Sequence, residues 1–309
     1  MKIVNTLLLF LIPVLLFSNE PIALSIEEHG FSGLWSPVEK ADAPILIVLG
    51  GSEGGVGFGR DIASPWLNSA GFHVLTVVYF RAEGLPDQLE EIPLEYLDKA
   101  ISWLDNKKGK QTEKMGLLGV SKGAEKALLQ ASRIDRFGAI ALVSPSSVIW
   151  QSINQRDFTS VKSSWTLGGE ALPFMPYCYD KGFVNVFNLY NCALDDPESM
   201  ESFIKAENIN APILLLSGGD DKLWPSERMA NMLIERLEAK DFSNEVIHLN
   251  YPKAGHWLLA PHIQGNANHP QLQNQQMFDF LGGSVENLLE IAPEVELAVI
   301  EFFKGNLEW

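Results

Sequence analysis

The sequence predicts an α/β protein with a mostly parallel sheet, helices on both faces and a lid-like insertion. Along most of the 309 residues, short apolar runs rich in β-branched residues alternate with helical segments. A glycine-flanked turn, Gly119-Val-Ser-Lys-Gly123, joins one of these strands directly to a helix. Further along the chain, Asp221 and His256 each follow another predicted strand.

The first half of the predicted core contains two strands and two helices. Residues 44–50 and 72–80 are strongly apolar and predict strands, and residues 62–70 between them predict a helix. Residues 92–106 predict an amphipathic helix that Pro93 opens, because proline suits the first helical turn. Its apolar positions recur at helical spacing: Leu94, Leu97, Ile101 and Leu104.

The second half of the predicted core continues the same alternation. Residues 115–119 predict a short buried strand, and a helix is predicted directly after it at 122–131. The remaining elements are a helix at 226–239 and strands at 138–144, 212–218 and 246–250. Strands that alternate with helices in this way form a mostly parallel sheet with both faces covered.

A long stretch without such alternation, about residues 145–211, separates two of the predicted strands. A structureless loop of this length is uncommon inside a compact domain, so we expect a lid-like insertion above the carboxyl edge of the sheet. Its aromatic side chains suit a substrate pocket or a small separate core, and we expect both uses. They are Trp150, Trp165, Phe174, Tyr177, Tyr179, Phe187 and Tyr190.

The turn at 119–123 fits the G-x-S-x-G pattern of a nucleophile elbow. Backbone and neighbouring strand crowd such a turn, so glycines flank the serine and its hydroxyl is pushed into the open. A serine hydroxyl is a weak nucleophile until a base takes its proton, and an acid must orient that base. Ser121 is the predicted nucleophile if both partners lie within reach.

Asp221 and His256 supply these partners in the order that the α/β-hydrolase fold requires. Asp221 follows the strand predicted at 212–218, and His256 follows the strand that ends at Asn250. In this fold the acid and the base lie on loops after core strands, in the chain order Ser, Asp or Glu, His. We therefore predict an α/β-hydrolase fold with Ser121, Asp221 and His256 as the catalytic residues.

Both partner assignments have alternatives in the sequence. Asp220 is adjacent to Asp221, and only one of the two can orient the histidine; if Asp220 does so, Asp221 caps the next segment. Five other histidines compete with His256. His29 precedes the sheet. Two histidines, His73 and His248, lie in core strands, where structural roles are expected. The two later ones, His262 and His269, are expected to line the pocket.

An oxyanion hole requires two backbone N–H groups near the serine. Lys122, the residue after the nucleophile, is expected to supply one. The other is expected from the glycine-rich loop after the first strong strand, at Gly51 or Ser52. That loop could instead be a phosphate-binding turn, but it lacks the G-K-[ST] ending and the G-x-G-x-x-G fingerprint. Neither a cofactor nor a metal is predicted.

The N-terminus has the layout of a secretory signal peptide. Lys2 gives it a positive start, residues 6–17 are apolar and Ser18 begins a polar stretch. The apolar run is short for a bilayer span. We expect a signal peptide at 1–18, a hydrolase domain at 19–309 and a secreted or periplasmic protein. The alternative is an uncleaved segment that anchors the protein to a membrane.

The composition is that of a globular protein with a formal net charge of −16. Nucleic-acid binding needs clusters of lysine and arginine, and this acidic sequence has none. We therefore expect a small-molecule partner and not a nucleic acid. Cys178 and Cys192 are the two cysteines. In an exported protein they could pair as a disulfide or remain free thiols, and the sequence leaves both possibilities open.

Several motifs are longer than the generic hydrolase signatures. They are Tyr79-Phe-Arg-Ala-Glu-Gly-Leu85, Leu89-Glu-Glu-Ile-Pro-Leu-Glu-Tyr96, Gly119-Val-Ser-Lys-Gly-Ala-Glu125, Ser163-Ser-Trp165, Leu172-Pro-Phe174, Asp220-Asp-Lys-Leu-Trp-Pro-Ser226 and Ala254-Gly-His256. In this order the chain resembles the C-terminal catalytic domain of the acyl-CoA thioesterase / bile acid-CoA:amino acid N-acyltransferase family. The resemblance runs from about Pro44 to the C-terminus.

The resemblance implies a triad that attacks a thioester, with Ser121 as nucleophile, Asp221 as acid and His256 as base. Family members that transfer the acyl group to an amine have a cysteine nucleophile, so the serine implies hydrolysis. We therefore expect a serine hydrolase that cleaves acyl thioesters through an acyl-enzyme. An exported carboxylesterase of the dienelactone-hydrolase type, acting on small oxygen esters, is the alternative within enzymes. A non-catalytic exported binding protein is the alternative outside them, although a binder has no need of a triad.

Overall fold

The computed structural model describes residues 20–108, 114–157, 159–179, 182–196, 201–260 and 272–308. The signal peptide predicted at 1–18 lies outside these ranges, as do His262 and His269. In the described ranges, every helix is too short or too polar to cross a membrane.

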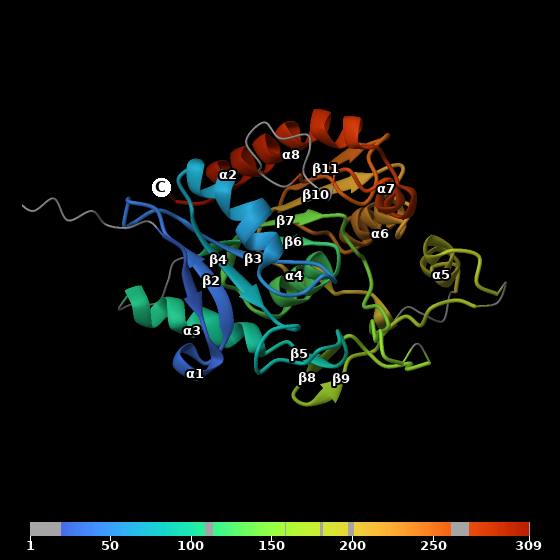
Figure 1. Ribbon diagram of the computed structural model, residues 1–309, viewed down its shortest axis with the longest axis horizontal. Helices are drawn as coiled ribbons and strands as arrows, with labels where there is room; N and C mark the ends of the chain where they lie inside the picture. Colours follow the sequence, from blue (N-terminus) through green and yellow to red (C-terminus); the bar gives the residue numbers. More distant parts are fainter. Residues whose placement is uncertain are drawn as a thin grey trace, which may run out of the picture.

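An eight-stranded sheet forms the centre of the molecule, with the strand order β1-β2-β4-β3-β6-β7-β10-β11 (Figure 1). Its strands are β1 (Ile22–Leu24), β2 (Ser32–Ser36), β3 (Ile45–Leu49), β4 (His73–Val78), β6 (Met115–Val120), β7 (Phe137–Val143), β10 (Ile213–Gly218) and β11 (Val246–Tyr251). Strand β2 pairs antiparallel with β1 and β4, and all other neighbours are parallel. The predicted mostly parallel sheet is confirmed; its antiparallel edge is absent from the prediction.

The apolar runs form strands because both faces of the sheet are buried. In β3, Ile45, Ile47 and Leu49 belong to one hydrophobic cluster, and Leu46 and Val48 belong to another on the opposite face. Successive side chains of a strand point to opposite faces, so a strand covered on both sides needs apolar residues at every position.

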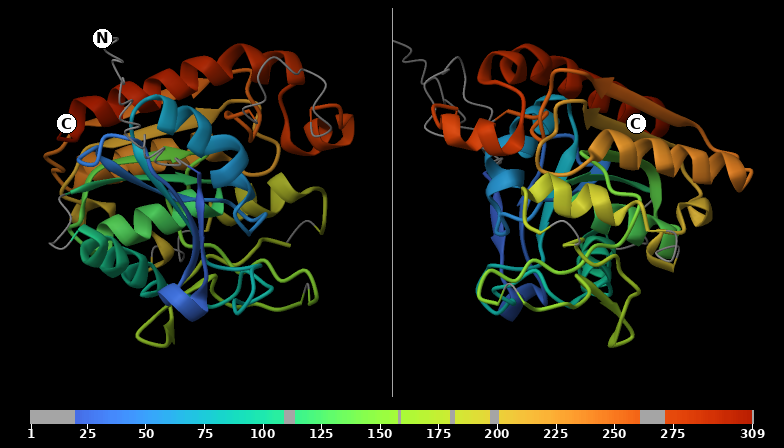
Figure 2. Two further views of the ribbon diagram at one scale, coloured as in Figure 1. Left: turned by 60° about the vertical axis from the view of Figure 1, so that its left-hand side comes forward. Right: turned by 90° about the vertical axis from the view of Figure 1, so that its right-hand side faces the viewer.

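Helices cover the two faces in separate layers (Figures 1 and 2). Helices α2 (Ser64–Ser69) and α8 (Val285–Asn306) pack on one face, and α3 (Tyr96–Lys108), α4 (Lys122–Arg133) and α6 (Ser226–Ala239) pack on the other. The prediction lacks α8, which runs along the sheet at the end of the chain. Two short helices, α1 (Ile26–His29) and α7 (Gln275–Leu281), lie outside these layers.

Two of the predicted helices begin at other residues in the structure than in the prediction. The helix predicted at 92–106 starts at Tyr96, because Ile92 and Pro93 form the short strand β5 beside β8 (Trp165–Leu167). The Ile92 N–H donates to the Ser164 carbonyl at 2.8 Å, so this backbone is extended and not helical. The segment predicted as helix at 62–70 is α2 preceded by a π-helical turn, η1 (Phe58–Ala63).

The segment predicted as an insertion at about 145–211 lies between β7 and β10. It contains β8, β9 (Glu170–Ala171), α5 (Val186–Ala193) and the 3-10 turn η3 (Ala206–Asn208). Strands β5, β8 and β9 form a second, three-stranded sheet. A disulfide joins Cys178 to Cys192. Part of the segment forms a small hydrophobic cluster together with the main domain. In it, Trp150 and Tyr190 pack with Trp224 and Met229 of the main domain.

Candidate active site

Ser121 lies on a tight turn between the end of β6 and the start of α4. Its φ is 54°, in the left-handed region that side chains rarely adopt. A Cβ at Gly119 would lie 2.4 Å from the Gly123 carbonyl oxygen, and one at Gly123 would lie 2.3 Å from that of Leu49. Only glycine fits at both positions, which is the physical reason for the predicted elbow motif.

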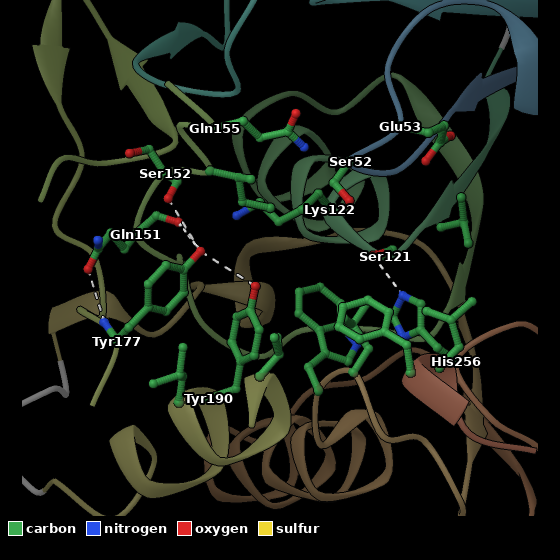
Figure 3. A pocket seen from close by; sticks show the side chains of 18 of the residues that line it. Ser52, Glu53, Ser121, Lys122, Gln151, Ser152, Gln155, Tyr177, Tyr190 and His256 are labelled. Carbon is green, nitrogen blue, oxygen red and sulfur yellow. Dashed lines mark hydrogen bonds between the residues drawn. The ribbon is translucent and has the colours of Figure 1, made fainter. Parts of the chain in front are cut away.

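A chain of hydrogen bonds joins Ser121, His256 and Asp221. The His256 Nε2 lies 2.9 Å from the Ser121 Oγ (Figure 3). The His256 Nδ1 lies 2.9 Å from the Asp221 Oδ2. All three residues are buried. The Leu223 and Trp224 N–H groups donate to the other oxygen of Asp221 at 3.0 and 3.2 Å and so fix its carboxylate. The structure thus brings together the three residues that the sequence predicts.

The alternatives to Asp221 and His256 have other partners. The Asp220 Oδ2 accepts the Gly283 N–H at 2.9 Å and lies 3.6 Å from the Lys222 ammonium. The His73 Nδ1 accepts the Val38 N–H, the His29 Nδ1 accepts the Ser25 N–H, and the His248 Nε2 pairs with the Ser217 Oγ. Each of these three histidines holds local structure.

Lys122 and Ser52 lie where oxyanion donors are predicted, whereas the Gly51 N–H has another partner. Lys122 is the first residue of α4, so its N–H has no acceptor inside the helix and lies at the positive end of the helix dipole. The Gly51 N–H instead donates to the Glu53 Oε1 at 2.9 Å, which corrects the prediction for Gly51 in this state. Ser52 lines the cavity beside Ser121.

Glu53 is a cavity residue that the sequence motifs do not single out. Its side chain stands near Ser52 and faces the space above Ser121 (Figure 3). Enclosure by the surrounding protein raises the pKa of Glu53, although the hydrogen bond from Gly51 and the nearby His256 act in the opposite direction.

The elbow helix is tied to the insertion by a buried ion pair. The Lys122 Nζ lies 2.6 Å from the Glu125 Oε2 and donates to the Ser164 Oγ at 2.8 Å. The Glu125 Oε1 accepts the Trp150 N–H at 3.0 Å and the Trp165 Nε1–H at 2.6 Å. A buried charge is tolerated only with such partners, so this network fixes the insertion relative to the elbow.

A cavity of about 1240 Å³ opens beside Ser121 and His256. Side chains from the glycine-rich loop, the insertion and the chain near α7 surround it, and most of its lining is apolar. Its aromatic members are Phe58, Tyr177, Tyr179, Phe183, Tyr190, Trp224, Trp257 and Phe280. A large, mainly apolar cavity with a few polar groups is the usual form of a small-molecule site.

Tyr177 and Tyr190 place two hydroxyl groups on the insertion side of this cavity. Their oxygens lie 3.5 Å apart, and the Tyr177 hydroxyl donates to the Gln151 carbonyl at 3.1 Å (Figure 3). Burial raises the pKa of Tyr190 to about 12, so its hydroxyl stays protonated at neutral pH. The predicted aromatic residues therefore divide between pocket and core: Tyr179 only lines the cavity, Tyr190 does both, and Trp165 lies in the main core.

The family model described as BAAT / Acyl-CoA thioester hydrolase C terminal matches residues 92–308. The chain belongs to this family. The family resemblance predicted from the motifs is thereby confirmed. The matched segment contains Ser121, Asp221 and His256, whereas the glycine-rich loop with Gly51 and Ser52 precedes it.

Curated relatives of the chain include two human proteins of the family. Human acyl-coenzyme A thioesterase 1 is 28% identical over 236 residues, which are 74% of this chain and 52% of the relative. Human mitochondrial acyl-coenzyme A thioesterase 2 is also 28% identical over 236 residues, with 74% of this chain and 46% of the relative covered. The chain thus matches about half the length of these relatives.

Solved structures with the same fold include α/β hydrolases. A putative dienelactone hydrolase from Klebsiella pneumoniae superimposes with a TM-score of 0.54 at 16% identity, over 92% of this chain and 98% of its own. An esterase from Pyrococcus furiosus gives a TM-score of 0.53 at 16% identity, over 90% and 87%. At this identity the likeness concerns the fold alone, and it confirms the predicted α/β-hydrolase fold.

In the described ranges, no cluster of three or more histidine, cysteine, aspartate or glutamate side chains is arranged to hold a metal ion. The groups that the described residues place at the site are a serine hydroxyl, an imidazole with an oriented carboxylate, and backbone amides. Together they can activate a hydroxyl nucleophile and bind a developing oxyanion.

Proposed function

We propose that this protein is a hydrolase of acyl thioesters and esters that works through an acyl-enzyme on Ser121. The hydrogen-bonded chain from the Ser121 Oγ through His256 to the Asp221 carboxylate carries the proposal. Membership of a family described by acyl-CoA thioester hydrolysis supports the reaction class.

In the acylation step, the His256 Nε2 takes the proton of the Ser121 hydroxyl while the Oγ attacks the carbonyl carbon. The carbonyl π electrons move to oxygen, and the Lys122 and Ser52 N–H groups stabilise the resulting oxyanion. When the intermediate collapses, the bond to the leaving thiol or alcohol breaks and His256 returns the proton to it. Asp221 holds His256 in the tautomer that exposes Nε2 to the serine and stabilises the imidazolium.

The deacylation step repeats this sequence with water. His256 takes a proton from a water molecule, which attacks the acyl carbonyl. The Ser121 Oγ then leaves with the proton that His256 supplies, and a free carboxylic acid is released. No cofactor takes part in this mechanism.

The cavity suggests the size of the acyl group. Its volume of about 1240 Å³ and its mostly apolar lining suit an acyl chain of medium or greater length better than an acetyl group. Burial of the chain would supply binding energy in proportion to its apolar area.

Replacement of the nucleophile tests the function. Ser121→Ala should lower kcat for thioester and ester hydrolysis by about 10³-fold or more, as in other enzymes that lose a triad member. Ser102→Ala, which removes a hydroxyl on α3 far from the cavity, serves as the matched control and should leave kcat unchanged. Near-complete retention of activity in Ser121→Ala would contradict the proposal.

We also propose that the protein is exported. The signal-peptide pattern at 1–18 supports this, and so does the disulfide between Cys178 and Cys192, because such bonds persist mainly in oxidising compartments.

A further inference from the structure

Among the described residues, the cavity beside Ser121 has more carboxylate side chains than lysine and arginine side chains. Glu53, Asp61 and Asp157 line it, and in the described part of the chain Arg81 and Lys122 are the lysine and arginine residues that do so, beside the catalytic His256. The formal net charge of −16 adds to the negative potential around it.

Both basic side chains are already engaged. Lys122 is fully buried in its ion pair with Glu125. The Arg81 guanidinium donates to the Asp87 carbonyl at 3.3 Å, to the Glu53 carbonyl at 3.4 Å and to the Gln155 side-chain oxygen at 2.5 Å. A phosphate group held here would have to displace these acceptors, since phosphates are bound chiefly by arginine, lysine and backbone N–H groups.

The acidic groups differ in what balances them. Asp61 is paired with the guanidinium of Arg60, so this pair adds little net charge. The Thr159 N–H and hydroxyl donate to the Asp157 Oδ1 at 3.0 and 2.6 Å and lower the pKa of that carboxyl, so Asp157 is ionised at neutral pH. Burial raises the pKa of Glu53 and so favours its neutral form, which leaves Asp157 as the main source of negative charge among the described residues that line the cavity.

We propose that this cavity selects acyl thioesters and esters whose leaving group is neutral or cationic, and that it disfavours the polyanionic leaving group of coenzyme A. Coenzyme A has a diphosphate and a further phosphate, and the exposed carboxylate of Asp157 and the net charge of the protein repel these groups, most strongly at low ionic strength. The inference rests on the proposed hydrolase function and narrows its substrate class.

Three thioesters of the same acyl group test the inference: octanoyl-pantetheine, octanoyl-thiocholine and octanoyl-CoA. They share the scissile bond and differ in the charge of the leaving group. At low ionic strength, kcat/KM for the pantetheine and thiocholine esters should exceed that for the CoA ester by about tenfold or more. Added NaCl should raise the CoA value through screening, lower the thiocholine value and leave the pantetheine value unchanged. A CoA ester hydrolysed as fast as the pantetheine ester at low salt would overturn the inference.

A charge reversal locates the effect in the cavity. Asp157→Lys should raise the ratio of kcat/KM for octanoyl-CoA to that for octanoyl-pantetheine severalfold. Asp42 is exposed and precedes β3, at the end of this strand that lies away from the cavity. Asp42→Lys is therefore the matched control and should not change this ratio. An unchanged ratio in Asp157→Lys would count against the inference. Failure of all three esters to show Ser121-dependent hydrolysis would contradict the proposed function itself, whereas a preference for CoA would contradict only this inference.

Discussion

At the residue scale, two adjacent carboxylates after β10 have different partners. Asp221 holds His256, and Asp220 binds the Gly283 N–H. The sequence favours Asp221 and leaves Asp220 as an alternative, because both follow the same strand at the same sheet edge. The turn directs the two side chains to different neighbours. Asp220 meets the Gly283 N–H in the loop before α8, and the sequence does not show that this loop lies beside it.

This difference predicts opposite outcomes for two matched variants. Asp221→Asn should lower kcat by about 10⁴-fold, because an amide no longer holds the required tautomer of His256. Asp220→Asn should change kcat by less than about threefold, because the half-exposed Asp220 carboxylate does not contact His256 and its ion pair with Lys222 is partly solvated. Steady-state kinetics of both purified variants measure this. Equal losses in the two would contradict the assignment of Asp221.

Lys126 is a buried ammonium on α4 that the proposed mechanism does not use. Its Nζ lies 4.6 Å from the centre of the Trp165 ring and 5.1 Å from that of Tyr79, and it donates to the Pro93 carbonyl at 3.5 Å. Burial, and to a smaller extent the nearby Arg133, lowers the pKa of Lys126 to about 7.

The lowered pKa makes the free energy of unfolding pH-dependent. Between pH 7 and about pH 10.5 the unfolded chain binds a proton at Lys126 that the folded protein does not, so stability from this group rises with pH across that range. Lys126→Met removes the cost of the buried ammonium. It should therefore raise Tm relative to the parent protein most at pH 7 and below, and less as the pH approaches 10. A difference in Tm that is constant from pH 7 to pH 10 would contradict the lowered pKa.

Sequence reasoning predicts the triad residues because the elbow motif and the chain order constrain them. Glu53 and Glu125 belong to no chemical motif, and their roles arise from contacts made in three dimensions. Glu53 matters because it folds back to the Gly51 amide, and Glu125 because Trp150 and Trp165 return to it from the insertion. Lys122 and Glu125, two charged residues in the first turns of α4, are fully buried, unlike the charged residues of a typical surface helix. That burial cannot be predicted from charge alone.

At the element scale, the core strands and the helix at Ser226–Ala239 match the prediction closely because their apolar runs are long and distinct. Helix α8 is missing from the prediction, although Leu288, Ile291, Ala292, Val295 and Val299 recur at helical spacing. The acidic residues between them and Pro293 weaken the pattern. The start of α3 depends on pairing between β5 and β8, which lie far apart in the sequence, so no local signal could give it.

The disulfide has a testable effect on the insertion. It links the chain before α5 to α5 itself, and α5 contributes Leu189 and Tyr190 to the cavity wall. The closed loop spans 14 residues, for which chain entropy predicts a stabilisation of about 3 kcal/mol. The double variant Cys178→Ser, Cys192→Ser should lower Tm and raise KM severalfold for an octanoyl thioester, with a smaller change in kcat. Unchanged Tm and KM would show that the bond does not organise the cavity wall.

At the scale of the whole molecule, the order of strands and helices could be predicted from the sequence, but the cavity could not. Its walls come from the glycine-rich loop, the insertion and the chain near α7, and its volume depends on how these separate segments pack. The acidic side chains of its lining likewise come from positions distant in sequence, such as Glu53 and Asp157.

Export is a property of the whole chain that can be measured directly. If residues 1–18 act as a signal peptide, protein recovered from outside the cytoplasm should begin at Asn19 and contain the oxidised pair Cys178 and Cys192. N-terminal sequencing and intact mass before and after reduction test this. Full-length protein that begins at Met1 and sediments with membranes would instead support an anchor.

The central claim is that Ser121 is an activated nucleophile in the folded protein. It is tested most directly by treatment with a fluorophosphonate followed by peptide mass spectrometry, with Ser121→Ala and heat-denatured protein as controls. The account predicts one adduct, on the peptide that contains Ser121, which is lost in both controls. An unlabelled folded protein, or equal labelling of Ser121→Ala, would contradict it.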